Sequence, residues 1–295
     1  MTTPTSIPVV LPEAQWRARQ AAHATRVAAW IDPHLARKSR GEKHPVEDFL
    51  WEYYRYRPGW LRRWHPGPEV VLAGDAAREF LRWPEYHTVD GGVALRLAAF
   101  DAGRIDSLRW MQTLLRATTE RAPQFACYGL HEWAMVYRQS AEEIRHAAWP
   151  LRFSPEETAR VVESQPIRCS HFDAFRFFTA AARPLNRLQP ERAAIIGGEQ
   201  RGCLHANMDL YKWAFKLAPF TPSELVADCF AFARDIREID MRASPYDFRA
   251  LGYAPIAIET PEGRADYEQH QRAFAARSEP LRARLLALVE RLLAA

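Results

Sequence analysis

The stretch His205-Ala-Asn-Met-Asp209-Leu-Tyr-Lys212-Trp213 sets three polar functional groups in a segment otherwise suited to a protein core. His205 and Asp209 are four residues apart, so a helix would place both on one face. Imidazole, carboxylate and ammonium groups are those that acid–base, metal and phosphate chemistry most often use. We therefore expect the rest of the chain to form a scaffold around this stretch.

The composition is that of an ordinary globular protein. With 295 residues, 48% hydrophobic and 26% charged, the chain can bury a sizeable core without covalent cross-links. Its cysteines have no Cys-x-x-Cys spacing, which argues against a disulfide framework or a structural zinc site and favours reduced, buried thiols. The four are Cys127, Cys169, Cys203 and Cys229.

Two features of the sequence bear on location. The N-terminal residues lack a basic region followed by an apolar run, and no stretch approaches the ~20 apolar residues of a membrane span. Free thiols fit a reducing compartment. We predict a cytoplasmic protein that does not associate with membranes, and the sequence does not indicate its oligomeric state.

Arginine dominates the basic residues, because lysine supplies only four of the 40. Arginine binds phosphate and stacks on bases, which suits a nucleic-acid partner. Codon usage in a GC-rich genome would produce the same bias. With a net charge of only +4, charge alone does not predict nucleic-acid binding.

Helical periodicity covers most of the chain. We predict that Pro33 ends the first helix and that Pro280 interrupts the last. No internal repeat or low-complexity segment occurs. The predicted fold is mainly α, a compact multi-helix bundle with minor β, forming a single all-helical domain over residues 1–295 with a flexible tail at 1–12. The predicted helices are 13–31, 46–56, 76–83, 105–119, 126–138, one beginning after the Ser154 cap, one capped by Ser170, one containing the opening stretch, 224–242 and one from 261 onward, with extended pieces at 70–75, 86–93 and 255–259.

The segment 49–65 is the most aromatic and basic part of the chain. Interleaved Arg and Trp or Tyr side chains can stack on bases and bind phosphates. They can also form one core face with solvated arginines between its members. We favour the core interpretation.

Several polar residues lie in apolar settings on separate predicted helices. On helix 224–242 we expect Asp240 at one border of the buried stripe, Asp228 and Asp235 at the other, and Arg237 facing away. Bundle interiors build metal and catalytic sites from such side chains. A Glu-x-x-His spacing at Glu143 and His146 is also typical of di-iron helices. The other members of the expected cluster are His131, Glu132, His171, Asp173, His205, Asp209 and Arg242.

One mechanism consistent with this set is hydrolysis of the N-glycosidic bond of a nucleobase. Asp209 would orient water and stabilise a cationic sugar, with His205 as its partner. Lys212 or Arg242 would bind phosphate, so the partner would be nucleic acid or a nucleoside-like small molecule. The candidate catalytic residues are His205, Asp209, Glu132 and His131, and the candidate substrate-binding residues are Lys212, Arg242, Asp173 and Tyr246.

A second mechanism uses a divalent metal such as iron, bound by His171, His205 and Asp209, with Glu132 as a further ligand. It would support oxygenase or hydrolytic chemistry on a small molecule, and the spacing slightly favours it. No His-Glu-x-x-His motif or paired Cys-x-x-Cys is present. A non-enzymatic binding protein is the third alternative. Both site hypotheses require His205 to lie near His171 or Asp235.

Five runs resemble a group of actinobacterial proteins labelled 3-methyladenine DNA glycosylase, over nearly the whole chain. The resemblance implies a base-excision hydrolase. The chain has no helix-hairpin-helix motif with a following catalytic Asp, so no catalytic residue is carried over. The runs are Gly41-Glu-Lys-His-Pro-Val-Glu-Asp-Phe-Leu50, Arg62-Arg-Trp-His-Pro-Gly67, Leu130-His-Glu-Trp-Ala-Met-Val-Tyr-Arg138, Ser170-His-Phe-Asp-Ala-Phe-Arg-Phe-Phe178 and Arg234-Asp-Ile-Arg-Glu-Ile-Asp-Met-Arg-Ala-Ser-Pro-Tyr-Asp247.

Overall fold

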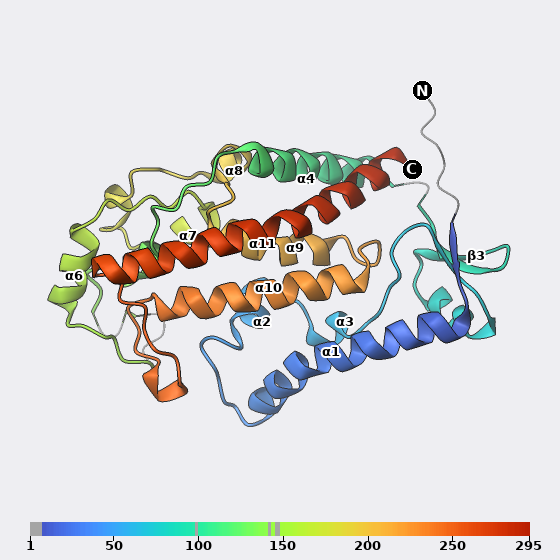
Figure 1. Cartoon of the computed structure of the whole chain (residues 1–295), viewed down its shortest axis with the longest axis horizontal. Coiled ribbons are helices and arrows are strands. Elements are labelled where there is room, and N and C mark those ends of the chain that lie inside the picture. Colours follow the sequence, from blue (N-terminus) through green and yellow to red (C-terminus); the bar gives the residue numbers. More distant parts are fainter. Residues whose placement is uncertain (1–7, 98–99, 141–142, 145–147) are drawn as a thin grey trace. The chain divides into compact units, whose positions relative to one another are not determined.

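The computed structural model describes residues 8–97, 100–140, 143–144 and 148–295 (Figure 1). These residues are mainly helical, with one small four-stranded sheet, as the sequence predicts. They separate into two compact units, whereas the sequence predicts a single domain. Unit 1 comprises residues 1–112, 210–233 and 283–295, and unit 2 comprises 113–209 and 234–282.

The sequence gives no sign of this division because helices carry the chain from one unit into the other. No proline- or glycine-rich linker marks the boundary. The helices with residues in both units are α4 (Ala102–Glu120), α9 (Leu204–Lys216), α10 (Ser223–Arg242) and α11 (Pro261–Ala294).

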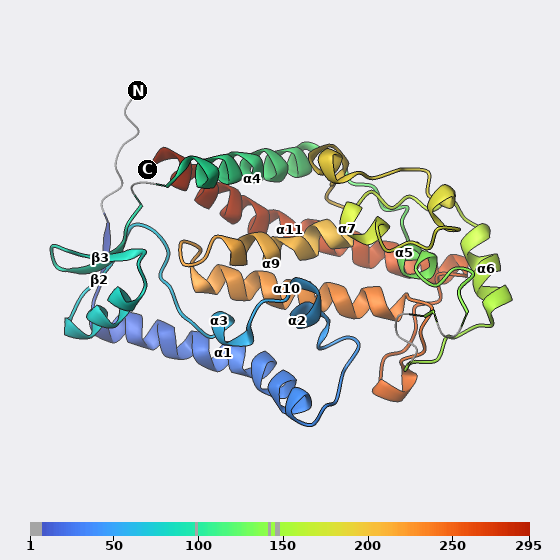
Figure 2. The same ribbon diagram turned by 180° about the vertical axis from the view of Figure 1, so that it is seen from behind.

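Unit 1 contains the sheet (Figure 2). Its strand order is β1-β2-β4-β3. Strand β1 pairs parallel with β2, while β3 and β4 form an antiparallel hairpin through Asp90-Gly91. Residues 9–11, predicted as part of a flexible tail, therefore form a strand, and residues 1–7 of that tail lie outside the described residues. The elements are β1 (Val9–Leu11), α1 (Glu13–Ser39), α2 (Phe49–Tyr54), α3 (Pro58–Leu61), β2 (Val70–Leu72), the 3-10 helix η1 (Asp75–Arg82), β3 (Tyr86–Val89) and β4 (Gly92–Leu95).

Helix α1 continues through Pro33, so the prediction that Pro33 ends it is wrong. Proline removes one helical hydrogen bond, but tertiary contacts hold the turns on both sides. Ile31 is fully buried, and His34 Nδ1 lies 2.9 Å from Asp48 Oδ1, which also accepts hydrogen bonds from Arg37. The predicted helix 46–56 is shorter in the structure, where it is α2.

The aromatic segment 49–65 is largely core, as favoured. Trp51 and Trp64 are buried, but Trp60 is 48% exposed. The core interpretation therefore does not extend to Trp60.

In unit 2, the secondary structure departs most from the prediction at residues with left-handed backbone angles. The predicted helix 126–138 is reduced to α5, because Tyr128 and Gly129 have φ of 48° and 72°. A Cβ atom on Gly129 would lie 3.2 Å from the Cβ of Ala243, so close packing explains the break. Helical periodicity in the sequence does not reveal this contact. The elements are α5 (Leu130–Ala134), α6 (Pro155–Glu163), α7 (Phe172–Phe175), the 3-10 helices η2 (Arg183–Leu185) and η3 (Arg192–Ala194), α8 (Ile195–Gly198) and the 3-10 helix η4 (Arg249–Leu251).

Of the two predicted helix caps, one is confirmed and the other is wrong. Ser154 and Glu157 form a reciprocal capping box at α6, as predicted. Ser170 is not the cap of α7, since His171 holds the extended position before that helix and gives no side-chain cap. Its imidazole is turned to other partners.

One further prediction fails in the last third of the chain. Pro280 does not interrupt α11, in which the buried Arg282 donates to Asn207 Oδ1 at 2.6 Å and holds the turn after the proline. Residues 255–257, predicted as part of an extended piece, have no regular secondary structure, and residues 258–259 lie in a turn. They run as irregular chain into α11.

Candidate metal centre

Unit 2 buries two adjoining triads of histidines and carboxylates. In each triad, one ligand atom per residue lies within 4.8 Å of the other two. Every member is at most 6% exposed. The first triad is His131, His205 and Asp240, and the second is His171, Glu199 and Asp209.

The first triad is assembled from three helices. His131 lies on α5, His205 in the first turn of α9 and Asp240 near the end of α10. The His131 and His205 rings meet at 82° with centroids 4.7 Å apart. Gly129 allows α5 to approach Ala243, directly after α10, and so brings His131 to Asp240.

His131 and Asp240 form a close, buried ion pair. His131 Nε2 lies 2.9 Å from Asp240 Oδ1. The other oxygen, Oδ2, lies 3.2 Å from Arg237 Nη1. Arg237 therefore fixes the carboxylate and leaves Oδ1 facing the histidines.

Arg237 is 1% exposed, so the prediction that it faces away from the core is wrong. Its Nη1 also donates to Glu132 Oε1 at 2.9 Å. A buried guanidinium needs such anions to offset its lost hydration. Glu132, a predicted catalytic residue, belongs to neither triad and instead bonds Arg237.

The second triad adjoins the first through stacked imidazoles. The rings of His171 and His205 lie 5.3 Å apart at 26°, so the required proximity of His205 and His171 holds. His171 Nε2 lies 3.5 Å from Glu199 Oε1 and 3.6 Å from Asp209 Oδ2. Asp235 lies elsewhere, in an exposed ion pair with Arg277.

The two contacts of His171 in the second triad have lengths close to those between two ligand atoms of one cation. Nitrogen and carboxylate ligands bind divalent transition metals at about 2.0 to 2.2 Å, so two atoms on one ion lie roughly 3.0 to 3.5 Å apart. The contacts of His171 fall at the upper end of that range or just beyond it, and they are long for hydrogen bonds. His171 Nδ1 is buried and has no partner in the described residues.

Neighbouring charged groups determine the direction in which the pKa of each histidine is shifted. Burial opposes a charged imidazole, but Asp240 and Cys127 raise the pKa of His131 well above its usual value. Against the same burial, Asp209 and Glu199 raise the pKa of His171 to about 9. His205, buried beside the His131 charge, has its pKa lowered well below the usual value. A divalent ion would displace the protons of His131 and His171, because metals bind neutral imidazole.

A small cavity of about 10 Å³ borders the first triad. That volume is roughly one water-sized sphere. His131, His205 and the thiols of Cys127, Cys169 and Cys203 line it. All four cysteines are free, but only Cys169 and Cys229 are buried as predicted, since Cys127 and Cys203 are partly exposed. Cys127 Sγ lies 3.4 Å from His131 Nδ1.

The four predicted substrate-binding residues belong to neither triad. Lys212, in unit 1, places its Nζ 4.4 Å from the centroid of the Trp213 ring. Arg242 donates to the carbonyl oxygen of Ala254. Asp173 pairs with Arg176, and the buried Tyr246 stacks on Phe248.

Sequence reasoning missed two participants. Glu199 follows α8 in a glycine-rich loop, where no helical period indicates its direction. Arg237 was assigned to the solvent face of its helix. Of the Glu-x-x-His pair, Glu143 accepts from the backbone N–H of Ser140, and His146 lies outside the described residues.

Comparisons with protein-family models, with curated proteins and with solved structures found no match. Among the residues that the structure describes, no helix combines the length and the apolar character needed to cross a membrane.

Proposed function

We propose that this chain is a divalent-metal enzyme whose ion is held by His131, His205 and Asp240. The observation that supports this most is the convergence of three buried ligand atoms, one from each residue, within 4.8 Å of one another. Two imidazoles and one carboxylate are the ligand set of non-haem iron(II) enzymes. Iron is therefore the expected metal.

The surrounding residues would position and tune this ion. Arg237 orients Asp240 through Oδ2, and Glu132 orients Arg237. Such outer partners fix ligand geometry in metalloproteins. The second triad supplies either a second ion site or a proton carrier, because His171 contacts two carboxylates.

The bordering cavity limits what reaches the centre. Its volume of about 10 Å³ is room for about one water and excludes a nucleobase without rearrangement. A bound ion would supply Lewis-acid or redox activation of such a small molecule. The proposed reaction class is therefore metal-assisted hydrolysis or oxygenation of a small substrate.

The N-glycosidase hypothesis stays a prediction. It requires release of free base from alkylated DNA or nucleosides, abolished by Asp209→Asn in a folded protein. Binding of nucleic acid or a partner that survives loss of both His205 and Asp209 would instead favour the non-enzymatic alternative. Neither result depends on the metal measurement below.

The test is metal content after purification without chelator and anaerobic reconstitution with Fe²⁺, Mn²⁺ or Zn²⁺. We expect about one ion per chain for the wild type, and loss of at least tenfold in affinity for Asp240→Asn or His205→Gln. The matched control is Asp48→Asn, which alters another buried carboxylate beside a histidine and an arginine, in unit 1. Absence of stoichiometric metal in the folded wild type, or equal loss in the control, would contradict the proposal.

A further inference from the structure

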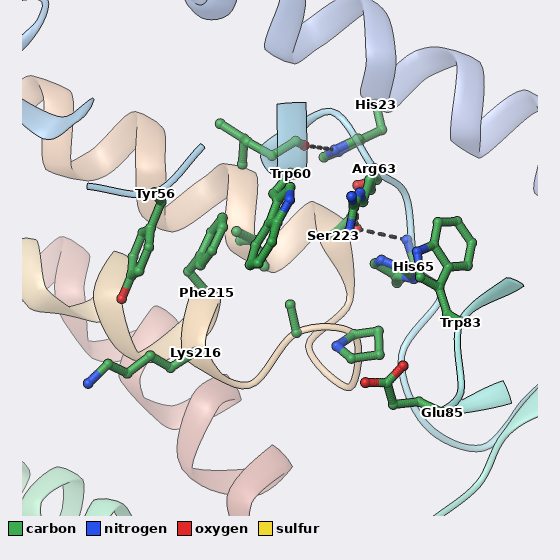
Figure 3. A pocket seen from close by; sticks show the side chains of 14 residues that line it. His23, Tyr56, Trp60, Arg63, His65, Trp83, Glu85, Phe215, Lys216 and Ser223 are labelled. Atoms are coloured by element: carbon green, nitrogen blue, oxygen red, sulfur yellow. Dashed lines mark hydrogen bonds between the residues drawn. The ribbon is translucent and has the colours of Figure 1, made fainter. Parts of the chain in front are cut away.

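Unit 1 contains a larger cavity, of about 350 Å³ (Figure 3). This volume lies within the usual range for small-molecule sites, roughly 300 to 1,000 Å³. All of its lining residues belong to unit 1. The cavity is therefore a separate site from the metal centre, whose residues all belong to unit 2.

One wall is a set of parallel aromatic rings. Tyr56 and Phe215 stack at 9° with centroids 3.9 Å apart, and Trp60 is parallel to Phe215 within 4° at 6.2 Å. Figure 3 shows the three rings side by side. Trp60 remains 48% exposed, so part of its ring is accessible to a ligand. The stack offers a flat surface to a planar ligand.

Cationic groups stand beside this wall. The Arg63 guanidinium carbon lies 5.2 Å from the centroid of the Trp60 ring, and no carboxylate of the described residues pairs with Arg63. Lys216 is also exposed at the cavity. Positive charge next to an aromatic platform suits a ring that carries an anionic group.

The remaining lining adds one acidic group. Glu85 lies beside Trp83 at the cavity (Figure 3), where its carboxylate can accept from an exocyclic amino group. His65 contributes no positive charge at neutral pH, since burial lowers its pKa to about 4. The lining therefore combines stacking surface, two cations and one acceptor.

We infer that this cavity binds a small planar heteroaromatic ligand with an anionic substituent, of the mononucleotide type. The ring would stack on Trp60, the anion would meet Arg63, and an amino group would donate to Glu85. This inference is independent of the proposed metal chemistry.

The test is isothermal titration of the full chain with adenosine monophosphate, adenosine and inorganic phosphate, and with a single-stranded oligonucleotide. We expect saturable binding of adenosine monophosphate and weaker binding of the other two small molecules. Trp60→Ala should weaken nucleotide binding about tenfold or more. Arg63→Gln should weaken the nucleotide several-fold and leave adenosine unaffected.

Two matched variants serve as controls. Trp110→Ala removes another partly exposed tryptophan of unit 1, and Arg62→Gln removes the neighbouring arginine, which pairs with Asp32 outside the cavity. Both should bind the nucleotide as the wild type does, and circular dichroism checks their folds. Equal weakening in these controls, or no saturable nucleotide binding, would overturn the inference. Binding of the oligonucleotide alone would overturn it in favour of a polymer site.

Discussion

At the scale of single residues, Arg237 shows how the buried charges of unit 2 are arranged. Its guanidinium bridges Glu132 and Asp240 inside the core, where an unpaired charge would be costly. The bridge leaves only Oδ1 of Asp240 directed at the histidines. We therefore regard Arg237 and Glu132 as positioning residues rather than ligands.

Because His65 is buried, we expect the free energy of unfolding to decrease in acid. Its imidazole is 7% exposed, and burial lowers its pKa from the ordinary 6.5 to about 4. The unfolded chain therefore binds this proton more readily than the folded chain does, so its contribution is intact above pH 6.5 and is lost as pH falls toward 4. The loss should reach on the order of 3 kcal/mol.

Urea denaturation between pH 7 and 4 measures this effect. His65→Gln should remove about one proton from the pH dependence of the free energy of unfolding. It would also lose the contact between His65 Nδ1 and the Tyr86 hydroxyl, so absolute stability should fall at pH 7. An unchanged pH slope in the variant would show that His65 is not the group responsible.

At the scale of elements, the short helix α5 depends on a glycine. Gly129→Ala should destabilise the protein by about 1 to 2 kcal/mol through its left-handed backbone, and further through contact with Ala243. The displaced His131 should also weaken metal binding. Gly252→Ala is the control, since Gly252 has a φ of 85° with no atom within 4 Å of an added Cβ.

Unfolding free energies and metal titrations of the two variants separate backbone strain from packing. Equal destabilisation and unchanged metal affinity in both would contradict the role assigned to Gly129. A larger loss in Gly129→Ala, with weaker metal binding, is the expected result.

Elements were predictable where local signals agree with tertiary packing. The capping box at Ser154 and the apolar period of residues 224–242 gave the start of α6 and the course of α10. The predicted breaks at Pro33 and Pro280 were wrong, because tertiary contacts of His34 and Arg282 stabilise the helical turns that follow these prolines. Local sequence contains no record of such partners.

Helical periodicity could predict those site residues that lie on helices. Of the predicted metal set, His171 and Asp209 lie in one triad and His205 lies in the other, with its ring stacked on that of His171. Glu199 was not predictable, since its loop has no period. The prediction that Arg237 faces solvent was also wrong, because its buried ion pairs outweigh the usual preference of arginine for the surface.

At the scale of the whole molecule, each compact unit has one candidate site. A ligand that binds the folded state raises its stability by mass action. We therefore expect separate thermal responses: Fe²⁺ should raise the melting temperature of the wild type and of Trp60→Ala, but not of Asp240→Asn.

Adenosine monophosphate should give the reverse pattern. It should stabilise the wild type and Asp240→Asn and leave Trp60→Ala unchanged. Differential scanning fluorimetry measures both responses. If one substitution abolished both shifts while the fold persisted, the assignment of one ligand to each unit would be wrong.

The three thiols beside the one-water cavity have a chemical consequence. If the neighbouring ion activates dioxygen, stray oxidant will reach sulfur within the same enclosure before it escapes. Protein turned over in air should therefore accumulate sulfenic and sulfinic acids on peptides containing Cys127, Cys169 or Cys203. Cys229 is buried in unit 1, outside that lining, and should stay unmodified. Peptide mass spectrometry of aged protein would then record past catalysis as added oxygen atoms.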